Sequence, residues 1–316
     1  MTLALLFSPQ GSQAPGMGRD LAAASPAARA VYAEADATLG WSVSEVCWTG
    51  PAERLNDTRQ TQPCLLATSV AAHRALVEAG GPSPSVVAGH SVGEYAALVA
   101  AGVLELGAAL RLVARRAELM AAADEEGGMA AVIGLGRDVV GAIVNRIAHP
   151  TELVVANDNA PGQVVISGRR DILRSAEAEM LAAGARRVLH LPVSGAFHSP
   201  LMSGVADELA AAFDQEAWAD ARVPVVSNVT AEPVTEASRI RALLAEQVRS
   251  PVEWVRCVER MVHDGVDTMV ECGAGAALIG MVRRIAPTVR TGTVSDRASL
   301  AAAVALLSGV PAEASA

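Results

Sequence analysis

The stretch Gly89-His90-Ser91-Val92-Gly93 decides how this chain folds. It follows the apolar run Val86-Val87-Ala88 and precedes a helix-like run over 94–100. A buried strand that turns sharply into a helix through Gly-x-Ser-x-Gly is a nucleophile elbow. The glycines are needed because the backbone is strained there and larger side chains would collide. The turn exposes the Ser91 hydroxyl and directs a helix N-terminus toward it, so the pattern predicts acyl transfer through a serine ester.

The composition favours one large α/β domain, or one domain with a smaller insertion. The chain has 316 residues, 51% hydrophobic and 3% aromatic, so a core of Ala, Val and Leu is expected. It contains no lysine, which excludes Schiff-base chemistry and a P-loop lysine. The net charge of −9 argues against general nucleic-acid binding.

The cysteines and histidines predict neither a disulfide frame nor a metal site. Six histidines show no H-E-x-x-H or other ligand spacing, and four cysteines show no C-x-x-C pair. The apolar N-terminal run over 3–7 is too short for a signal peptide. No uninterrupted apolar run is long enough to span a membrane. We therefore expect a cytoplasmic protein that binds neither metal nor membrane.

Strand and helix patterns alternate along the chain, which predicts a mostly parallel sheet with helices on both faces. The expected strands are 3–7, 85–88, 223–227, 268–271 and 290–294. The expected helices are 26–39, 65–79, 94–100, 106–123, 201–213, 240–249, 252–262 and 274–285.

A segment with a different order of expected strands and helices interrupts this alternation. Its expected elements are strand 129–135, helix 139–147, strands 153–156 and 163–167, helix 171–183 and strand 187–191. The order β-α-β-β-α-β is the ferredoxin-like motif. We therefore predict an α/β-hydrolase-like catalytic core over 1–126 and 193–308, an inserted ferredoxin-like subdomain over 127–192, and a C-terminal tail over 309–316.

A base for Ser91 is expected at His198, in Gly195-Ala196-Phe197-His198-Ser199-Pro200. His198 follows a predicted strand, and sites in open α/β sheets form at the carboxyl ends of strands. A capping or core histidine is the alternative from the residues alone. The α/β-hydrolases run Ser, acid, His, with the histidine near the C-terminus. Here more than a hundred residues follow His198.

These motifs, in this order and spacing, resemble the malonyl-CoA:acyl carrier protein transacylases, including the acyltransferases of polyketide synthases. The resemblance covers residues 3–295. It is carried by Gln10-Gly11-Ser12-Gln13, Gly89-His90-Ser91-Val92-Gly93-Glu94, Arg116, His198 and Gln247, and supported by Thr61-Gln62-Pro63, Asn157-Asp158-Asn159-Ala160-Pro161-Gly162-Gln163, Ser227-Asn228-Val229-Thr230 and Ser250-Pro251-Val252-Glu253-Trp254.

The resemblance implies a role for each of these residues. Ser91 would attack malonyl-CoA, and His198 would move the proton. The backbone N–H groups of Gln10 and Val92 would form the oxyanion hole, and the carbonyl of Gln247 would orient His198. The malonyl group would pass to the phosphopantetheine thiol of an acidic acyl carrier protein. No metal or other cofactor is implied.

The implied substrate contacts include Arg116, whose guanidinium fork suits a free carboxylate. Arg116 is displaced by about 100° from Arg115 around its helix, so it can point inward. A solvated surface arginine is the alternative. The other implied pocket residues are Phe197, His90, Gln62 and Asn159. Phe197 resembles the malonyl-selecting versions, because a bulky ring there excludes an α-methyl group.

One departure concerns the loop over 8–11, where Pro9 stands in place of the family's usual glycine. Pro9 fixes φ just before the implied oxyanion donor Gln10, so the loop is expected to differ if that glycine has positive φ.

Docking of an acidic carrier protein requires local basic patches on this acidic chain. The candidates are Arg169-Arg170, Arg186-Arg187 and Arg283-Arg284, with solvated arginines as the alternative.

Two other functions stay open from the sequence. A thioester hydrolase of the same fold would use water as acceptor, although the carboxylate-binding arginine favours malonyl transfer. A non-catalytic scaffold would have lost site residues, and all are present. The pathway, fatty-acid or polyketide synthesis, is not decided.

Overall fold

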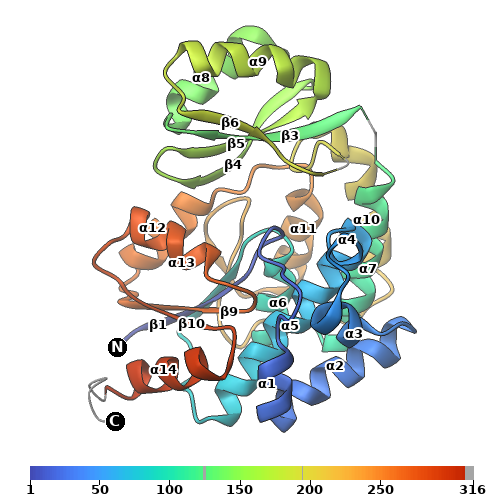
Figure 1. The fold of residues 1–316 in the computed structure, drawn as a ribbon, viewed down its shortest axis with the longest axis vertical. Helices are drawn as coiled ribbons and strands as arrows, with labels where there is room; N and C mark the ends of the chain where they lie inside the picture. The colour runs from blue at the N-terminus through green and yellow to red at the C-terminus, as the bar shows by residue number, and fades with distance from the viewer. Residues whose placement is uncertain (124–125, 194, 310–316) are drawn as a thin grey trace.

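The computed structural model describes residues 1–123, 126–193 and 195–309. Two sheets organise these residues, and the smaller sheet lies above the larger one in Figure 1. The larger sheet has the strand order β10-β9-β1-β2-β7-β8, and the smaller has the order β4-β5-β3-β6. The chain is therefore a mixed α/β protein with a parallel-rich sheet, as the sequence predicts.

In the larger sheet every pair of neighbours is parallel except β7 and β8. Its strands are β1 (Leu3–Phe7), β2 (Val86–Gly89), β7 (Val225–Val226), β8 (Pro233–Val234), β9 (Thr268–Cys272) and β10 (Arg290–Val294). All five residues of β1 are apolar and buried, which is typical of a parallel strand covered on both faces.

Twelve α-helices and a short 3-10 turn surround this sheet within the described residues. They are α1 (Arg19–Ala24), α2 (Pro26–Leu39), α3 (Val43–Thr49), α4 (Ala52–Leu55), α5 (Thr58–Glu78), α6 (Gly93–Ala100), α7 (Leu106–Ala121), η1 (Pro200–Met202), α10 (Ser203–Phe213), α11 (Ala237–Gln247), α12 (Trp254–His263), α13 (Ala277–Ile285) and α14 (Arg297–Ser308).

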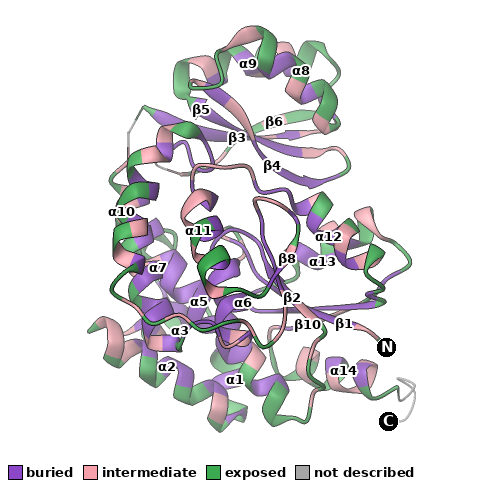
Figure 2. Ribbon diagram, turned by 180° about the vertical axis from the view of Figure 1, so that it is seen from behind, coloured by how far each residue is buried: buried purple, intermediate pink, exposed green. Residues whose placement is uncertain are grey.

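The alternation of side chains along β1 divides the core into two layers. Leu5 and Phe7 pack with side chains of α2, α5 and α7 on one face. Ala4 and Leu6 pack with side chains of α12 and α13 on the other. Successive residues of a strand point to opposite faces, so one apolar strand supplies both layers. Figure 2 shows buried strands at the centre and exposed helix surfaces around them.

The smaller sheet is antiparallel, and its elements follow the order β-α-β-β-α-β along the chain. They are β3 (Gly127–Ile133), α8 (Arg137–Ile147), β4 (Leu153–Ala160), β5 (Gln163–Arg169), α9 (Arg170–Ala182) and β6 (Arg187–His190). Ala130 and Ile166 pack beneath α8 and α9. Met129 and Val165, on the opposite face, belong to the core of the larger part.

A backbone connection fixes the smaller sheet against the larger part of the chain. Val252 donates its N–H to the carbonyl of Ala156 at 2.8 Å and accepts from the N–H of Asp158 at 3.1 Å. Beside it, Arg137 at the start of α8 forms an ion pair with Glu253, with Nη2 2.8 Å from Oε1. These contacts place the end of β4 directly over the elbow.

The sequence pattern misplaced several boundaries. Helix α5 begins at Thr58, whereas the predicted helix began at residue 65. The prediction began too late because proline usually breaks a helix, and Pro63 lies inside this one. Strand β4 continues to Ala160, beyond the predicted strand end at residue 156. The sequence patterns did not predict α1, α3, α4, α14 or β8. Residues 310–316 of the predicted tail lie outside the described residues.

Candidate active site

The elbow lies where β2 ends and α6 begins. Ser91 has φ 53°, in the left-handed region that non-glycine residues rarely occupy. A Cβ on Gly93 would lie 2.2 Å from the carbonyl oxygen of Phe7, and one on Gly89 would lie 2.0 Å from the backbone of Gly93. Both positions therefore require glycine, because β1, β2 and the start of α6 approach one another too closely for any side chain.

Ser91 and His198 form a hydrogen-bonded pair. Ser91 Oγ lies 2.8 Å from His198 Nε2, although 107 residues separate them in the chain. His198 Nδ1 lies 2.8 Å from the backbone oxygen of Gln247, and the His198 N–H donates to the oxygen of Val248 at 2.9 Å. Both carbonyls belong to the C-terminal end of α11, where carbonyls lack intrahelical partners and carry partial negative charge. A helix end thus takes the place of a triad carboxylate.

The environment keeps His198 neutral. Burial, together with the positive charge of Arg116, lowers the pKa of His198 to about 3. A carbonyl at Nδ1 accepts a hydrogen bond, so the ring proton resides on Nδ1 and the lone pair on Nε2 faces Ser91 Oγ. This is the protonation state that a general base requires.

Arg116 is buried beside the nucleophile, with 1% of its surface exposed. Its Nη2 donates to Ser91 Oγ at 3.0 Å, and its Nη1 donates to Gln62 Oε1 at 2.7 Å. A third bond runs from Nη2 to Gln247 Oε1 at 3.2 Å. In the described part of the chain all these acceptors are neutral, and Arg116 Nε has no partner. The guanidinium is therefore a buried cation without a directly bonded anion, which suits it to a carboxylate.

A second layer of polar groups surrounds the Ser91 peptide. Asn228 Oδ1 accepts from the Ser91 N–H at 2.7 Å, and Asn228 Nδ2 donates to the oxygen of Gly89 at 2.7 Å. Gln247 Nε2 donates to the Ser91 oxygen at 3.0 Å and to Glu94 Oε2 at 2.7 Å. The sequence analysis assigned no role to Asn228 or Glu94. Glu94 adjoins the elbow motif and could have been found as a charged residue in an apolar helix.

The nucleophile opens into a cavity of about 150 Å³ between the two sheets. Its lining residues are Pro9, Gln10, His90, Ser91, Met120, Met129, Asn157, Asn159, Val165, Leu191, Val193, Phe197, His198 and Met281. Of the residues predicted to contact substrate, Phe197, His90 and Asn159 line this cavity, and His90 Nε2 lies 2.8 Å from Asn159 Oδ1. Neither Arg116 nor Gln62 is among the lining residues; Arg116 instead reaches Ser91 Oγ from behind the lining, and Gln62 accepts from Arg116.

Of the two implied oxyanion donors, Gln10 lines this cavity and Val92 adjoins a residue that does. Val92 lies at the N-terminal end of α6, next to Ser91. Neither N–H donates to an acceptor within the described ranges. The positive φ of this loop occurs at Gly11, with φ 98°, so Pro9 is compatible with the loop's conformation.

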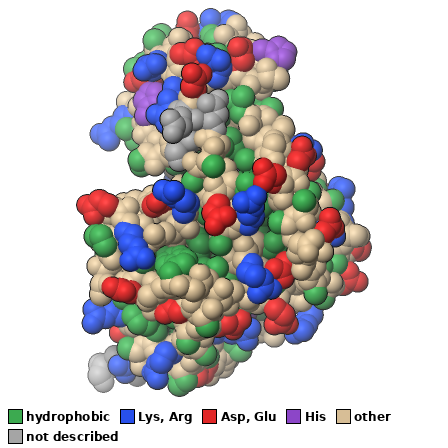
Figure 3. Space-filling model, turned by 90° about the vertical axis from the view of Figure 1, so that its right-hand side faces the viewer, with side chains coloured by type: hydrophobic (Ala, Val, Ile, Leu, Met, Phe, Trp, Pro, Cys, Tyr) green, Lys and Arg blue, Asp and Glu red, His purple; other side chains and the backbone are tan. Residues whose placement is uncertain are grey.

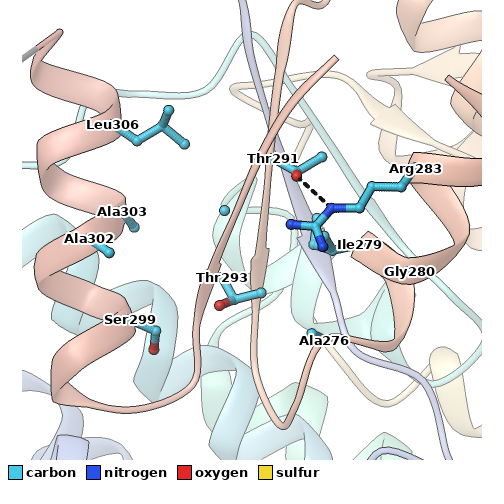
Figure 4. A pocket seen from close by; sticks show the side chains of 11 residues that line it. Ala276, Ile279, Gly280, Arg283, Thr291, Thr293, Ser299, Ala302, Ala303 and Leu306 are labelled. Atoms are coloured by element: carbon cyan, nitrogen blue, oxygen red, sulfur yellow. Dashed lines mark hydrogen bonds between the residues drawn. The ribbon is translucent and has the colours of Figure 1, made fainter. Parts of the chain in front are cut away.

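A larger cavity of about 430 Å³ lies between α13, β10 and α14 (Figure 4). Arg283 is its one charged lining residue, and its Nε donates to Thr291 Oγ1 at 3.2 Å. The remaining lining residues are small or apolar and include no histidine, cysteine or carboxylate. Of these two cavities, as lined by the described residues, the smaller one contains a nucleophile in contact with a base.

The described residues contain no cluster of three or more His, Cys, Asp or Glu side chains that could bind a metal ion. Among the helices of the same residues, none is long and apolar enough to cross a membrane.

Comparison with known proteins gives consistent matches. The family model for the acyl transferase domain matches residues 4–302. Malonyl CoA-acyl carrier protein transacylase of Escherichia coli (strain K12) is 41% identical over 305 residues, covering 96% of this chain and 99% of the relative. The protein of the same name from Bacillus subtilis (strain 168) is 40% identical over 308 residues, covering 96% and 97%.

Solved structures agree with these matches. One is a type II PKS acyl-carrier protein in complex with its malonyl-transacylase, with TM-score 0.93, 40% identity, and coverage of 98% of this chain and 100% of that chain. Another is an acyl-carrier-protein S-malonyltransferase from Burkholderia pseudomallei 1710b, with TM-score 0.93, 38% identity, and coverage of 96% and 99%.

Proposed function

The chain belongs to the acyl transferase domain family, and on that premise we propose that it transfers a malonyl group from malonyl-CoA to an acyl carrier protein. The acyl group passes through an ester on Ser91 and then to the phosphopantetheine thiol of the carrier. The observation that carries this proposal is the position of Arg116, whose Nη2 lies 3.0 Å from Ser91 Oγ.

Ser91 and His198 perform the bond chemistry. His198 Nε2 takes the proton of Ser91 Oγ as the oxygen attacks the thioester carbonyl, and then gives it to the departing CoA thiolate. The second half-reaction reverses these steps, with the carrier thiol attacking the serine ester. The carbonyls at the end of α11 stabilise the transient imidazolium, because a helix C-terminus favours positive charge.

The N–H groups of Gln10 and Val92 form the oxyanion hole. Among the residues that the structure describes, neither N–H has an acceptor, which supports this role because both are available to a developing oxyanion. Each such donor contributes ~3 kcal/mol of transition-state stabilisation in comparable sites. Every step uses a side chain or a backbone N–H, so the proposal requires no cofactor beyond the two thiol carriers.

Arg116 binds the free carboxylate of the malonyl group, which separates malonyl from neutral acyl groups. A carboxylate would replace neutral acceptors with a charged one and could also use the unpartnered Nε. Phe197, His90 and Asn159 line the space for the rest of the acyl group, while Gln62 positions Arg116.

We assign the domains on the basis of the two sheets. The larger sheet and its helices correspond to an α/β-hydrolase-like core over 1–126 and 193–308. The β-α-β-β-α-β order and the strand order β4-β5-β3-β6 support a ferredoxin-like subdomain over 127–192.

An acidic carrier protein would dock at local arginine pairs. Figure 3 shows one face on which arginine and acidic side chains are interspersed, so the contact would be local. Two of the candidate pairs converge: Arg186 lies beside Gly134, and Arg284 lies beside Gly162, which is hydrogen-bonded to Gly134. Reversing the charge of Arg186 should weaken carrier transfer while sparing hydrolysis of the CoA thioester.

Intact-protein mass spectrometry tests the function directly. A short incubation with malonyl-CoA should give a malonyl adduct on the wild type and none on the Ser91→Ala variant. Methylmalonyl-CoA and acetyl-CoA serve as alternative donors. Absence of a malonyl adduct on the wild type would overturn the proposal, whereas an adduct that water removes as fast as the carrier thiol would favour the hydrolase.

A further inference from the structure

Glu94 is a buried carboxylate that the steps above do not use. It lies in the first turn of α6 with 3% of its surface exposed. Its Oε2 accepts from Gln247 Nε2 at 2.7 Å and from the Asn228 N–H at 3.3 Å. An anion in an apolar core carries a large desolvation cost, so a buried carboxylate beside a reactive site is a candidate for a functional role.

Both partners of Glu94 contact the nucleophile's backbone. Asn228 Oδ1 accepts from the Ser91 N–H, and Gln247 Nε2 donates to the Ser91 oxygen. The two flanking peptide groups of Ser91 are thereby hydrogen-bonded from both sides. This matters because φ 53° is an unfavourable conformation that surrounding contacts must maintain.

The carboxylate also determines which way the Gln247 amide points. An ionised carboxylate only accepts hydrogen bonds, so it must face the NH₂ end of the amide. With Nε2 directed at Glu94, the Oε1 end is directed at Arg116, where it accepts from Nη2 at 3.2 Å. A reversed amide would place NH₂ against the guanidinium and remove the donor from the Ser91 oxygen.

We propose that ionised Glu94 is a positioning residue that orients the Gln247 amide and, through it, fixes both Arg116 and the strained Ser91 for acylation. This inference rests on the proposed function, because it assigns Glu94 to the same malonyl-binding site. Glu94 touches neither the reacting atoms nor the cavity lining.

The pKa of Glu94 makes the inference testable through the pH dependence of acylation. Burial raises the pKa of Glu94 to about 7. The other charged or titratable groups that face it are Arg116 from α7, Tyr95 from its own helix and Cys257 from α12. Burial raises the pKa values of Tyr95 and Cys257, while that of His198 is lowered to about 3. Of the groups that face the Gln247 amide and the nucleophile, Glu94 is the one with a pKa near neutral pH. The buried Glu271, which accepts from Ser8 Oγ at 2.9 Å, also has a pKa raised to about 7, so the Glu94 variants are needed to assign the titration.

The direction in which the acylation rate changes with pH follows from the charge state in which Glu94 acts. Glu94 is ionised above its pKa and protonated below it, and a protonated carboxyl can donate a hydrogen bond and permit the reversed amide. Acylation of the wild type should therefore rise as the pH increases through about 7. That limb of the profile belongs to Glu94 and not to the histidine base.

The experiment measures single-turnover formation of the malonyl ester from pH 5 to 9 (a range set by the pKa of about 7). The donor is malonyl-N-acetylcysteamine, which carries no titrating phosphate. The variants are Glu94→Gln and Glu94→Asp, with the exposed Glu118→Gln as the control for loss of a carboxylate. Thermal unfolding of each variant reports whether it is folded.

Support requires four results. Folded Glu94→Gln should acylate about 30-fold more slowly at pH 8, the size of one lost hydrogen bond to a charged group. Its rate should not rise through neutral pH, and acetyl transfer should fall less than malonyl transfer. Glu94→Asp should retain an acid limb at a shifted pH, which also serves as the test if Glu94→Gln does not fold.

Two outcomes count against the idea and are distinguishable. Wild-type enzyme that forms no malonyl ester overturns the proposed function and this inference with it. Wild-type ester formation whose acid limb is unchanged in Glu94→Gln, or unshifted in Glu94→Asp, overturns the inference alone.

Discussion

Removing the Arg116 guanidinium should convert a malonyl-selective enzyme into a slow and unselective one. We consider Arg116→Met, which keeps much of the buried volume, with Arg115→Ala as the matched control. Arg115 is the adjacent residue but lies on the surface, where its Nη1 is 3.6 Å from Glu118 Oε2. Loss of a surface arginine should change neither substrate selection nor rate.

The size of the effect follows from the contacts of Arg116. A fork-like pair with a carboxylate contains two charge-assisted bonds of about 1.5–3 kcal/mol each. The free enzyme already bonds the guanidinium to Gln62, Ser91 and Gln247, and some of these bonds must be exchanged when malonate binds. The net loss is then near the lower limit, about 3 kcal/mol, or roughly 200-fold in kcat/KM.

The assay compares kcat/KM for malonyl-CoA and acetyl-CoA in each variant. Acetyl lacks the carboxylate and should lose only the effect of the bond from Arg116 to Ser91 Oγ, which at the lower limit of about 1.5 kcal/mol is roughly tenfold. Equal losses for malonyl and acetyl transfer in Arg116→Met would refute the carboxylate assignment and leave Arg116 a structural role.

Two further predictions concern the acyl pocket and the elbow. Phe197→Ser should raise the ratio of methylmalonyl to malonyl adduct by about 10–200-fold in competition mass spectrometry, because the ring fills the cavity beside the ester; an unchanged ratio would remove Phe197 from substrate selection. Gly93→Ala should abolish cooperative thermal unfolding, since its Cβ would lie 2.2 Å from the Phe7 oxygen. The matched control is Gly141→Ala in α8, where the added Cβ meets nothing within 4 Å, and it should instead gain about 0.5–1 kcal/mol of stability. A melting temperature of Gly93→Ala equal to that of the wild type would contradict the crowding argument.

Local signals in the sequence identified the parts of the site that depend on local geometry. The strand-turn-helix context of Ser91 and the angular displacement of Arg116 are properties of single elements. The structure accordingly has the predicted elbow and buries Arg116. The Arg111 side chain of the same helix forms a surface ion pair with Glu216.

Contacts between residues far apart along the chain could not be predicted from such local signals. Asn228 contacts the Ser91 peptide across 137 residues, and only the pairing of β2 with β7 brings them together. In the sequence Glu94 resembles any other polar residue of a helix, because its buried partners, Gln247 and Asn228, lie far away along the chain. The early part of α5, which carries Gln62, was missed because Pro63 signals a helix break in the sequence while the helix continues through it.

The cavity draws its two walls from different sheets. Met129, Asn159 and Val165 come from the antiparallel sheet, whereas His90 and Ser91 come from the elbow of the parallel sheet. Substitutions in the first group reshape the space offered to the acyl chain without altering the distance between nucleophile and base. The antiparallel sheet therefore supplies positions at which the acyl space can be altered while the nucleophile and its base stay in place.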